Sequence, residues 1–228
     1  MDDVKNFYNQ IQFPGTYLVE SLDYHSPIII NPYLRLIDNV LSEELTVLDV
    51  GCGSGFITNF FAKTYSRSHF TGVDFSPASI NHARFISQEA NIQNTNFVNA
   101  DFASYSTDQQ FDVVICQGVL HHMPNYSEIV KKLTNMIKDD GYLILGVYHP
   151  WGKIAKKYVG IDYQDQVLYV DQEQHPYELS FNYRAVTSMF PEFKLEKCYP
   201  KFFGLVALPN LFNYKNGGLT TYVFKKNY

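Results

Sequence analysis

Cysteine is scarce in this chain, and its scarcity limits the structures that can be expected. The 228 residues include three cysteines, Cys52, Cys116 and Cys198, and no Cys-x-x-Cys pair. The number is odd and the spacing is wide, so neither a disulfide framework nor a zinc ribbon is expected. Such cysteine usage is typical of a protein that works in a reducing compartment.

Positive charge and long hydrophobic runs are also in short supply. Lys and Arg together number 18 against 23 Asp and Glu, which leaves a net charge of −5. Nucleic acids and anionic membranes attract proteins with a surplus of cations, so neither is an expected partner. No apolar stretch approaches the roughly 20 residues of a membrane-spanning helix, and the opening MDDVKNFYNQ does not resemble a signal peptide. We therefore expect a cytoplasmic protein without membrane insertion.

Aromatic residues, by contrast, are abundant. The chain has 18 Phe and 18 Tyr, and hydrophobic residues make up 46% of the sequence. This composition is sufficient for a sizeable buried core. Many of the tyrosines lie outside the apolar runs, which fits either packing near the surface or a pocket for an apolar or aromatic small molecule.

Short apolar runs alternate with helical patterns between residues 45 and 148. Strands that are apolar throughout and separated by helices are typical of a parallel sheet covered on both faces. The expected strands of this region are residues 46–50, 69–74, 96–99, 111–117 and 141–148. One intervening helix begins at Ser76 and Pro77, and another is expected to end at Asp140 and Gly141.

The rest of the chain is less regular. A helix is expected over residues 32–41, another over 185–190, and two further strands over 193–199 and 219–225. We expect a single domain with four parts. They are an N-terminal leader or lid (1–44), a cofactor-binding core (45–148), an insertion or cap (149–182) and a C-terminal helix with a β-hairpin (183–228).

A glycine-rich loop, GCGSG at residues 51–55, follows the first expected strand and opens a helix. Such a loop permits close approach of a ligand, and the helix N-terminus offers N–H donors to an anionic group. The loop alone is a weak signal, because it also serves simple packing of helix on strand. Acidic residues at successive strand ends, Asp49, Asp74 and Asp101, strengthen the signal. Asp74 is spaced from the loop like the acid that accepts ribose hydroxyls in dinucleotide folds.

The loop departs from the dinucleotide-binding fingerprint, because Phe56 stands where the third glycine would be. Four motifs in order, VLDVGCGSG (47–55), GVDFSP (72–77), NADF (99–102) and FDVVICQGVLHHM (111–123), carry a different resemblance. The chain resembles the class I S-adenosylmethionine-dependent methyltransferases, above all the small-molecule branch that includes the ubiquinone and menaquinone enzymes. The resemblance covers residues 45–148.

The resemblance implies a fold and a cofactor. The expected fold is a Rossmann-like α/β fold with helices on both faces of a seven-stranded, mostly parallel sheet, in the order 3-2-1-4-5-7-6 with the last strand antiparallel. The cofactor would be S-adenosylmethionine, with S-adenosylhomocysteine as product. Its sulfonium and ammonium groups are cationic, which suits strand ends lined with acids.

The resemblance also assigns cofactor contacts residue by residue. The backbone of Gly51, Cys52 and Gly53 would receive the methionine moiety, with Asp49 orienting the loop or the ammonium group. Gln117 and the loop after it would border the same end of the cofactor.

At the nucleoside end, the resemblance gives Asp74 the ribose hydroxyls and places Phe75 against the adenine. Asp101 and the backbone of Phe102 would read the edge of the adenine ring.

Methyl transfer needs alignment of the acceptor and, for some acceptors, a base that removes a proton. His121 and His122 follow the fourth expected strand, Tyr148 ends the fifth and His149 follows it, so these four residues are the catalytic candidates. Packing and capping are the alternative roles for each of them. Weaker candidates from the leader are Tyr17, Tyr24 and His25, while His69 and His175 are expected at the surface or in turns.

No metal site is expected. Catechol-type relatives have an aspartate at the end of strand four, where this chain has Gln117. A zinc site from His121, His122 and His149 lacks the usual ligand spacing. Cys116 lies near the same strand end but has no cationic neighbour, so we expect a buried structural thiol rather than a nucleophile.

The functional hypothesis is methyl transfer to a small, apolar or aromatic acceptor beneath a cap. One alternative is an RNA or protein methyltransferase of the same fold, for which the run KIAKK (153–157) would be a local basic patch. Others are a catalytically inactive, cofactor-binding regulatory protein and a nicotinamide oxidoreductase. Association into homo-oligomers is left open by the sequence.

Overall fold

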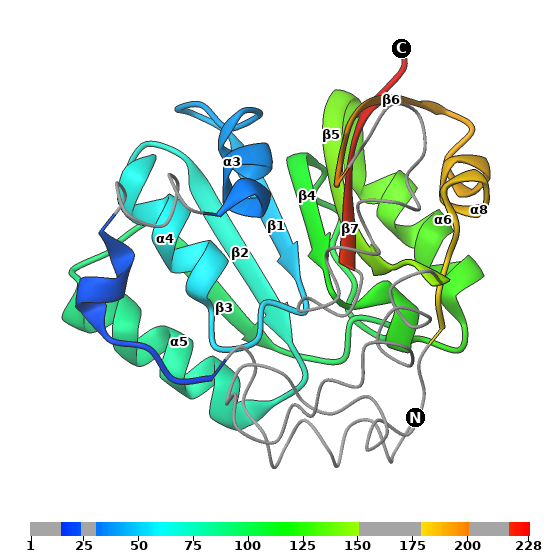
Figure 1. Ribbon diagram of the computed structural model, residues 1–228. Coiled ribbons are helices and arrows are strands. Elements are labelled where there is room, and N and C mark those ends of the chain that lie inside the picture. The colour runs from blue at the N-terminus through cyan, green and yellow to red at the C-terminus, as the bar shows by residue number, and fades with distance from the viewer. Residues whose placement is uncertain (1–14, 24–30, 151–178, 201–218) are drawn as a thin grey trace.

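A twisted central sheet with helices on both faces makes up the computed structural model, which describes residues 15–23, 31–150, 179–200 and 219–228 (Figure 1). The described strands form a seven-stranded sheet in the order β3-β2-β1-β4-β5-β7-β6. Their bounds are β1 Thr46–Val50, β2 His69–Asp74, β3 Thr95–Asn99, β4 Phe111–Gln117, β5 Ile137–Tyr148, β6 Phe193–Tyr199 and β7 Leu219–Lys226. Only β7 runs against its neighbours among these strands. The predicted order and the antiparallel last strand are confirmed.

Three of the described α-helices begin at a side-chain cap. The side chain of Asn31 accepts hydrogen bonds from the backbone N–H groups of Tyr33 and Leu34, and proline occupies the first helical position after it. Ser76 and Pro77 begin the next capped helix in the same way. The helices are α3 Pro32–Asp38, α4 Phe56–Thr64, α5 Pro77–Glu89, α6 Tyr126–Met136 and α8 Tyr183–Met189, with 3₁₀ turns η1 Val19–Leu22 and η2 Leu120–His122.

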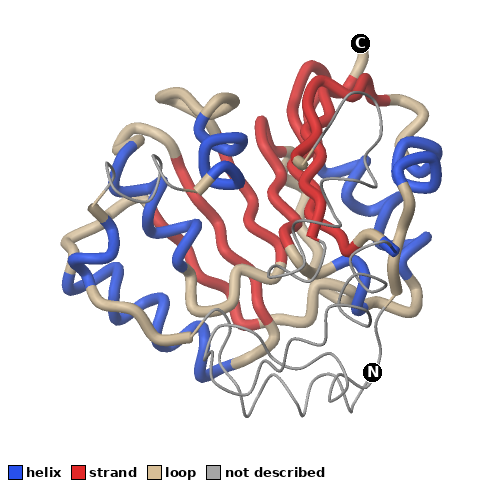
Figure 2. The backbone as a smooth tube through the Cα atoms, in the orientation of Figure 1, coloured by secondary structure: helices blue, strands red, loops and turns tan. Residues whose placement is uncertain are grey.

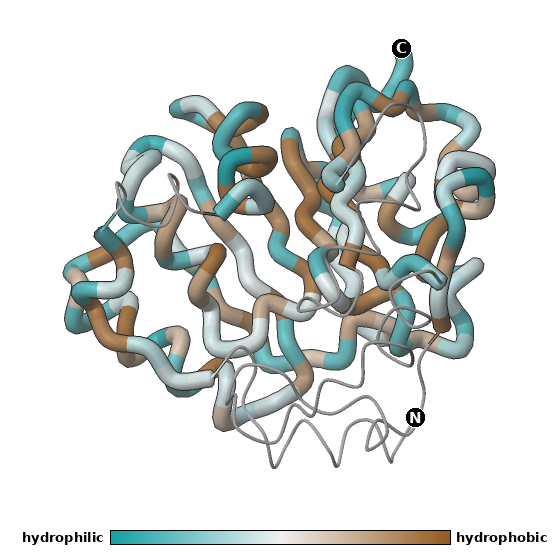
Figure 3. Tube along the Cα trace, viewed as in Figure 1, coloured by the Kyte–Doolittle hydropathy of each residue, from teal (hydrophilic) through white to brown (hydrophobic). Residues whose placement is uncertain are grey.

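Successive side chains of each central strand enter different cores. In β4, Val113 and Ile115 pack with α3 and α4, whereas Val114 and Cys116 pack with α6 and α8. This alternation follows from the two-residue repeat of a strand, and it explains why both kinds of position are apolar. Figure 2 shows the helices on either side of the sheet, and Figure 3 shows hydrophobic residues along the central strands.

Several predicted helix bounds differ from the structure. The helix expected over 32–41 ends at Asp38, and the one expected over 185–190 covers Tyr183–Met189. The boundary before the fifth strand differs most. We expected the helix before the fifth strand to end at Asp140 and Gly141, but α6 ends at Met136, and β5 begins at Ile137, which pairs with Phe111. Ile137 is fully buried. Its apolar side chain continues the helical stripe in the sequence, so periodicity alone cannot separate the last turn of the helix from the first residue of the strand.

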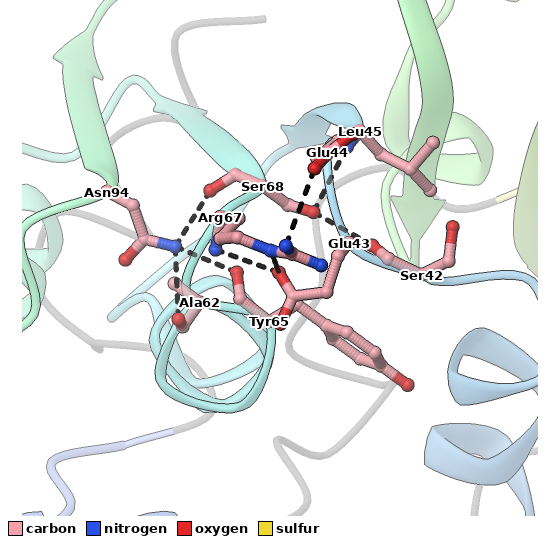
Figure 4. A network of polar contacts seen from close by, with 9 residues as sticks. All are labelled: Ser42, Glu43, Glu44, Leu45, Ala62, Tyr65, Arg67, Ser68 and Asn94. Atoms are coloured by element: carbon pink, nitrogen blue, oxygen red, sulfur yellow. Dashed lines mark hydrogen bonds and ion pairs between the residues drawn. The ribbon is translucent and has the colours of Figure 1, made fainter.

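Polar contacts tie the amino ends of the strands together. The side-chain nitrogen of Asn94 donates to the carbonyl oxygens of Ala62, Tyr65 and Ser68, at 3.0, 3.0 and 2.8 Å (Figure 4). Arg67 lies beside this network and donates its backbone N–H to Glu43. These contacts join β2, β3 and α4 at the edge of the sheet opposite the glycine loop.

A second polar group stands at the same amino edge. Asp112 accepts hydrogen bonds from the backbone and hydroxyl of Thr46, at 2.8 and 2.7 Å, and from Lys138 Nζ at 2.9 Å. These contacts lock the start of β1 to β4 and β5.

The described part of the leader packs on the glycine loop and the helices that follow it. Ser54 Oγ donates to the carbonyl oxygen of Gly15 at 2.8 Å, and Asn59 donates to the Tyr17 hydroxyl at 2.9 Å. The ring of Tyr17 also packs edge-on against Phe56 and His82. Residues 15–17 are therefore anchored to the loop that the sequence analysis singled out.

Candidate active site

The glycine loop turns sharply between β1 and α4. Gly51, Gly53 and Gly55 have φ values of 66°, 53° and 79°, a left-handed backbone that favours glycine. A Cβ on Gly51 would also collide with the side chain of Val119. The turn thus requires glycine at these positions, and the close approach of the loop after β4 also requires it at Gly51.

The backbone donors of this loop are engaged within the protein. The N–H groups of Gly51 and Cys52 both donate to the carbonyl oxygen of Val73, at 2.8 and 3.2 Å. Gly53 N–H donates to Asp74 at 2.9 Å. The donors expected for an anionic group are those of the helix N-terminus, and α4 begins at Phe56, so that expectation does not depend on these three residues. Because the loop has no bulky side chains, a ligand can approach its backbone closely. Acidic side chains lie beside it.

Asp74 fastens the loop to the end of β2. One carboxylate oxygen accepts from Gly53 N–H and the other from Ser76 N–H, at 2.9 and 2.8 Å. Burial raises the pKa of Asp74, and the two backbone hydrogen bonds oppose that rise in part. The side chain is held in one orientation by two elements, which preorganises it for further contacts.

Asp49 lies beneath the loop in β1 and is buried. Thr58 of α4 donates its hydroxyl to Asp49 Oδ2 at 2.7 Å. Burial raises the pKa of Asp49 to about 7, with a smaller contribution from the nearby charge of Asp74. The described contacts of Asp49 include no cationic partner. A cationic group on a bound ligand would therefore stabilise its charged form.

The residues assigned to the adenine end lie at the ends of β2 and β3. Ala100 N–H donates to the carbonyl oxygen of Asp74 at 2.9 Å, which joins the two strand ends. Phe75 is half-buried, while the side chain of Phe102 is buried in the core. Asp101 Oδ1 accepts the N–H of Ala103 at 2.9 Å and so shapes the turn after β3.

A cavity of about 230 Å³ opens beside the glycine loop. Its wall combines Asp49, Gln117 and the loop with residues that the sequence analysis did not assign to a site. The lining residues are Asn31, Tyr33, Leu34, Ile37, Asp49, Gly51, Cys52, Gly53, Phe56, Ile57, Gln117 and Leu219. Asp74, Asp101 and the catalytic candidates are not among them. No signal in the sequence showed that the first turns of α3 and the start of β7 face this cavity.

The side chain of Gln117 reaches across the neighbouring strand at the edge of the cavity. It pairs in register with Gly146 of β5, which pairs in turn with Thr221 of β7. Gln117 Nε2 donates to Thr221 Oγ1 at 2.7 Å. A Cβ on Gly146 would collide with the Gln117 amide. Glycine in the middle strand thus lets one side chain span three strands.

The catalytic candidates gather beyond the ends of β4 and β5. The ring of His121 lies 4.1 Å, centroid to centroid, from the rings of both His122 and Tyr148. His149 is also buried, and burial lowers the pKa of its imidazole. The chain returns to this cluster at Phe181, whose N–H donates to the carbonyl oxygen of Tyr148 at 2.8 Å.

Several expectations fall on residues outside the described ranges. They are the leader candidates Tyr24 and His25, His175, the basic run at 153–157 and most of the expected cap, residues 151–178. Of the leader candidates, Tyr17 is described, and it packs on α4 and α5 as given above.

Cys116 is buried, as are Cys52 and Cys198. Burial raises the pKa of Cys116 to about 12, which disfavours the thiolate that a nucleophile requires. Within the described ranges, His, Cys, Asp and Glu side chains form no group of three or more suited to a metal ion. None of the helices in those same ranges is long and apolar enough to cross a membrane.

Comparisons with known proteins identify the family of the chain. Residues 41–149 match a family described as a methyltransferase domain. (S)-coclaurine N-methyltransferase of Papaver somniferum is 31% identical over 160 residues, which are 69% of this chain and 44% of that protein. Ubiquinone biosynthesis O-methyltransferase of Rickettsia bellii is 31% identical over 157 residues, which are 67% of this chain and 62% of that protein. The chain thus spans less than two thirds of either relative.

Solved structures show the same fold. Coclaurine N-methyltransferase bound to N-methylheliamine and S-adenosylhomocysteine gives a TM-score of 0.62 at 15% identity, covering 98% of this chain and 86% of that one. The plantazolicin methyltransferase BpumL gives 0.62 at 19% identity, covering 100% and 90%. The sheet order is that of a Rossmann-like methyltransferase fold. The chain contains a class I S-adenosylmethionine-dependent methyltransferase domain.

Proposed function

We propose that this protein transfers a methyl group from S-adenosylmethionine to a small, apolar or aromatic acceptor. The observation that carries the proposal is the cavity beside the glycine loop, where Asp49 faces apolar side chains of α3, α4 and β7. Pockets for small molecules are lined in this way, mostly apolar with a few polar groups that fix orientation.

The residues at the carboxyl ends of β1 and β2 suit this cofactor. When bound, S-adenosylmethionine supplies an electrophilic methyl group on a positively charged sulfur. Asp49 would face the cationic methionine end beside Gly51, Cys52 and Gly53, and its raised pKa means that a cation is what favours its charged form. Gln117 would border the same end of the cofactor.

At the nucleoside end, Asp74 is held by Gly53 and Ser76 and would accept the ribose hydroxyls. Phe75 would pack on the adenine, and Asp101 with the backbone of Phe102 would read the edge of the ring. These assignments follow the resemblance and are part of the proposal.

The acceptor would lie against the apolar wall of the same cavity. Leu34, Ile37 and Ile57 offer aliphatic surface, and Tyr33 and Phe56 offer aromatic surface. Relatives named as N-methyltransferases and O-methyltransferases support nitrogen or oxygen as the acceptor atom. Much of the rate would come from aligning the acceptor in a site that excludes water.

Proton removal, where the acceptor needs it, is assigned to the cluster beyond β4 and β5. His149, His122, His121 and Tyr148 are the candidates. The lowered pKa of His149 keeps its imidazole neutral near pH 7, which is the form that accepts a proton. None of the four lines the described cavity, so a role in catalysis requires that the acceptor extend toward them.

The test is methylation of an unfractionated small-molecule extract. The protein is incubated with S-adenosylmethionine carrying an isotope-labelled methyl group, and products are found by mass spectrometry. We expect a labelled metabolite whose mass has grown by one methylene unit. Label in RNA or in protein instead would favour the macromolecular alternative. Cofactor binding without a labelled product of any kind would favour an inactive regulatory protein.

A further inference from the structure

Lys132 of α6 directs its ammonium group at the turn that follows β3. Its Nζ donates to the carbonyl oxygens of Phe102 at 2.6 Å and Ala103 at 3.2 Å, and also to that of Tyr105. The same nitrogen lies 4.8 Å from the centroid of the Phe102 ring. A lysine has three N–H donors, so one side chain fixes three carbonyl groups of a single turn.

Asp101 organises the same turn from its other side. Its carboxylate accepts the N–H of Ala103 at 2.9 Å, and its carbonyl oxygen accepts those of Ser104 and Tyr105, at 3.0 and 2.9 Å. Asp101 therefore accepts hydrogen bonds from the N–H groups of the turn, and Lys132 donates hydrogen bonds to its carbonyl groups. The conformation of residues 101–105 depends on both.

The placement of Lys132 differs from that of its neighbour. Lys131 on the same helix is exposed, whereas the Lys132 side chain is half-buried against Phe102. Burial lowers the pKa of Lys132, and the charge of Asp101 opposes that change. Removing a cation from water is unfavourable unless it gains partners, so the three carbonyl groups account for its position.

We propose that Lys132 is a positioning residue for the adenine end of the cofactor site. It holds the turn at 101–105 in the conformation in which Asp101 and the backbone of Phe102 meet the edge of the adenine ring. This inference rests on the proposed function. It gives a binding role to α6, a helix that does not line the described cavity.

A role in adenine recognition and a role in folding alone make different predictions. If the turn reads the adenine edge, losing its support reduces the preference for adenine over a base with a different edge. S-inosylhomocysteine is a suitable probe, because a carbonyl oxygen replaces the adenine amino group and N1 carries a proton, while the ribose and the homocysteine are those of S-adenosylhomocysteine. Loss of stability alone would weaken both ligands equally.

The experiment measures the dissociation constants of both ligands by calorimetry for the wild-type protein, Lys132→Met and Lys131→Met. Methionine keeps the length of the side chain and removes its charge and donors. We expect Lys132→Met to bind S-adenosylhomocysteine roughly tenfold more weakly. Removing a group that supports a metal ligand typically weakens metal binding by about 10- to 100-fold, and we take the lower end of that range. The variant's preference over S-inosylhomocysteine should also fall, while Lys131→Met should match the wild type in both.

Unchanged selectivity in Lys132→Met would overturn the inference, even if the variant melted at a lower temperature. If that variant does not fold, Lys132→Arg replaces it, because arginine keeps the charge but its planar fork cannot point three donors at one place. Wild-type selectivity in Lys132→Arg would then overturn the inference. Failure of the wild-type protein to bind S-adenosylhomocysteine would overturn the proposed function, and the inference with it.

Discussion

Buried or half-buried carboxylates stand at both ends of the sheet, but their surroundings differ. At the amino ends, Asp112 is held by Thr46 and Lys138. Partial burial raises its pKa, but these hydrogen bonds and the lysine charge outweigh burial, and the net pKa lies below the ordinary value. At the carboxyl ends, Asp49 accepts from the Thr58 hydroxyl and Asp74 from two backbone N–H groups, all neutral donors, and burial raises the pKa of both.

The difference lies in whether the charge of the carboxylate is stabilised within the fold. Asp112 has its cation within the fold, so its charge is already stabilised when the protein is empty. Asp49 and Asp74 would gain such stabilisation from a bound cation or from hydroxyl donors. We propose that the amino edge maintains the fold and that the carboxyl edge binds the cofactor.

The largest expected effect is on cofactor affinity when Asp74 is removed. Asp74→Ala loses the anchor of Gly53 and the proposed ribose contacts, so binding of S-adenosylhomocysteine should weaken by roughly 1.5–3 kcal/mol. Asp112→Ala is the matched control, since it removes a carboxylate from the other edge; it should lower the free energy of unfolding and leave the affinity unchanged. Calorimetry that finds equal affinities in all three proteins would remove Asp74 from the site.

The next effect concerns stability at the amino edge. Asn94→Ala deprives the carbonyl groups of Ala62, Tyr65 and Ser68 of a shared donor, and the free energy of unfolding should fall by about 2 kcal/mol. Gln93→Ala, at the exposed neighbouring position, is the control and should unfold like the wild type. Denaturant titration measures both. A loss of cofactor affinity in folded Asn94→Ala would contradict the division between the two edges.

Asp49 should make cofactor binding depend on pH. Its pKa of about 7 in the free protein means that it holds a proton below that pH, and a cationic cofactor favours the unprotonated form. Affinity for S-adenosylmethionine should therefore rise with pH up to about 7 and then level off, by at most about tenfold per pH unit. Asp49→Asn cannot titrate and should show a flatter profile between pH 5.5 and 7.5. Parallel profiles would show that Asp49 does not face the bound cation.

The smallest effect is expected at the surface of the amino edge. Arg67 forms ion pairs with Glu43 and Glu44 at 3.9 and 3.6 Å, but its side chain is 67% exposed. Solvent and salt screen such pairs, so Arg67→Ala should change the free energy of unfolding by no more than about 0.5 kcal/mol. A thermal melt checks this prediction, and a loss comparable to that of Asn94→Ala would show that the ion pairs matter more than their exposure implies.

Much of the fold could be predicted because local patterns determine it. The alternation of apolar runs and helical stripes located six strands within a residue at each end, and the motifs supplied their order. The start of β5 could not be found, because Ile137 is apolar in either a helix or a strand. Its assignment depends on pairing with Phe111, a contact between distant parts of the chain.

The site was less predictable than the fold. Strand-end acids and the glycine loop could be read directly, because each follows a recognisable strand. The wall formed by α3 and the support of Gln117 by Thr221 could not, since both depend on how separate elements pack and pair. Lys132 was missed for the same reason: helical spacing places it beside Ile129 and Met136, but its contact with the turn after β3 depends on how α6 packs.

Hydrogen-exchange mass spectrometry with and without S-adenosylhomocysteine tests the comparison of the two edges most directly. The account predicts ligand-dependent protection in peptides that cover the glycine loop, the end of β2 and the turn at 101–105. Peptides that cover Asn94, Arg67 and the start of β1 should exchange at the same rate in both samples. Protection at the amino edge, or none at the carboxyl edge at saturating ligand, would contradict the account.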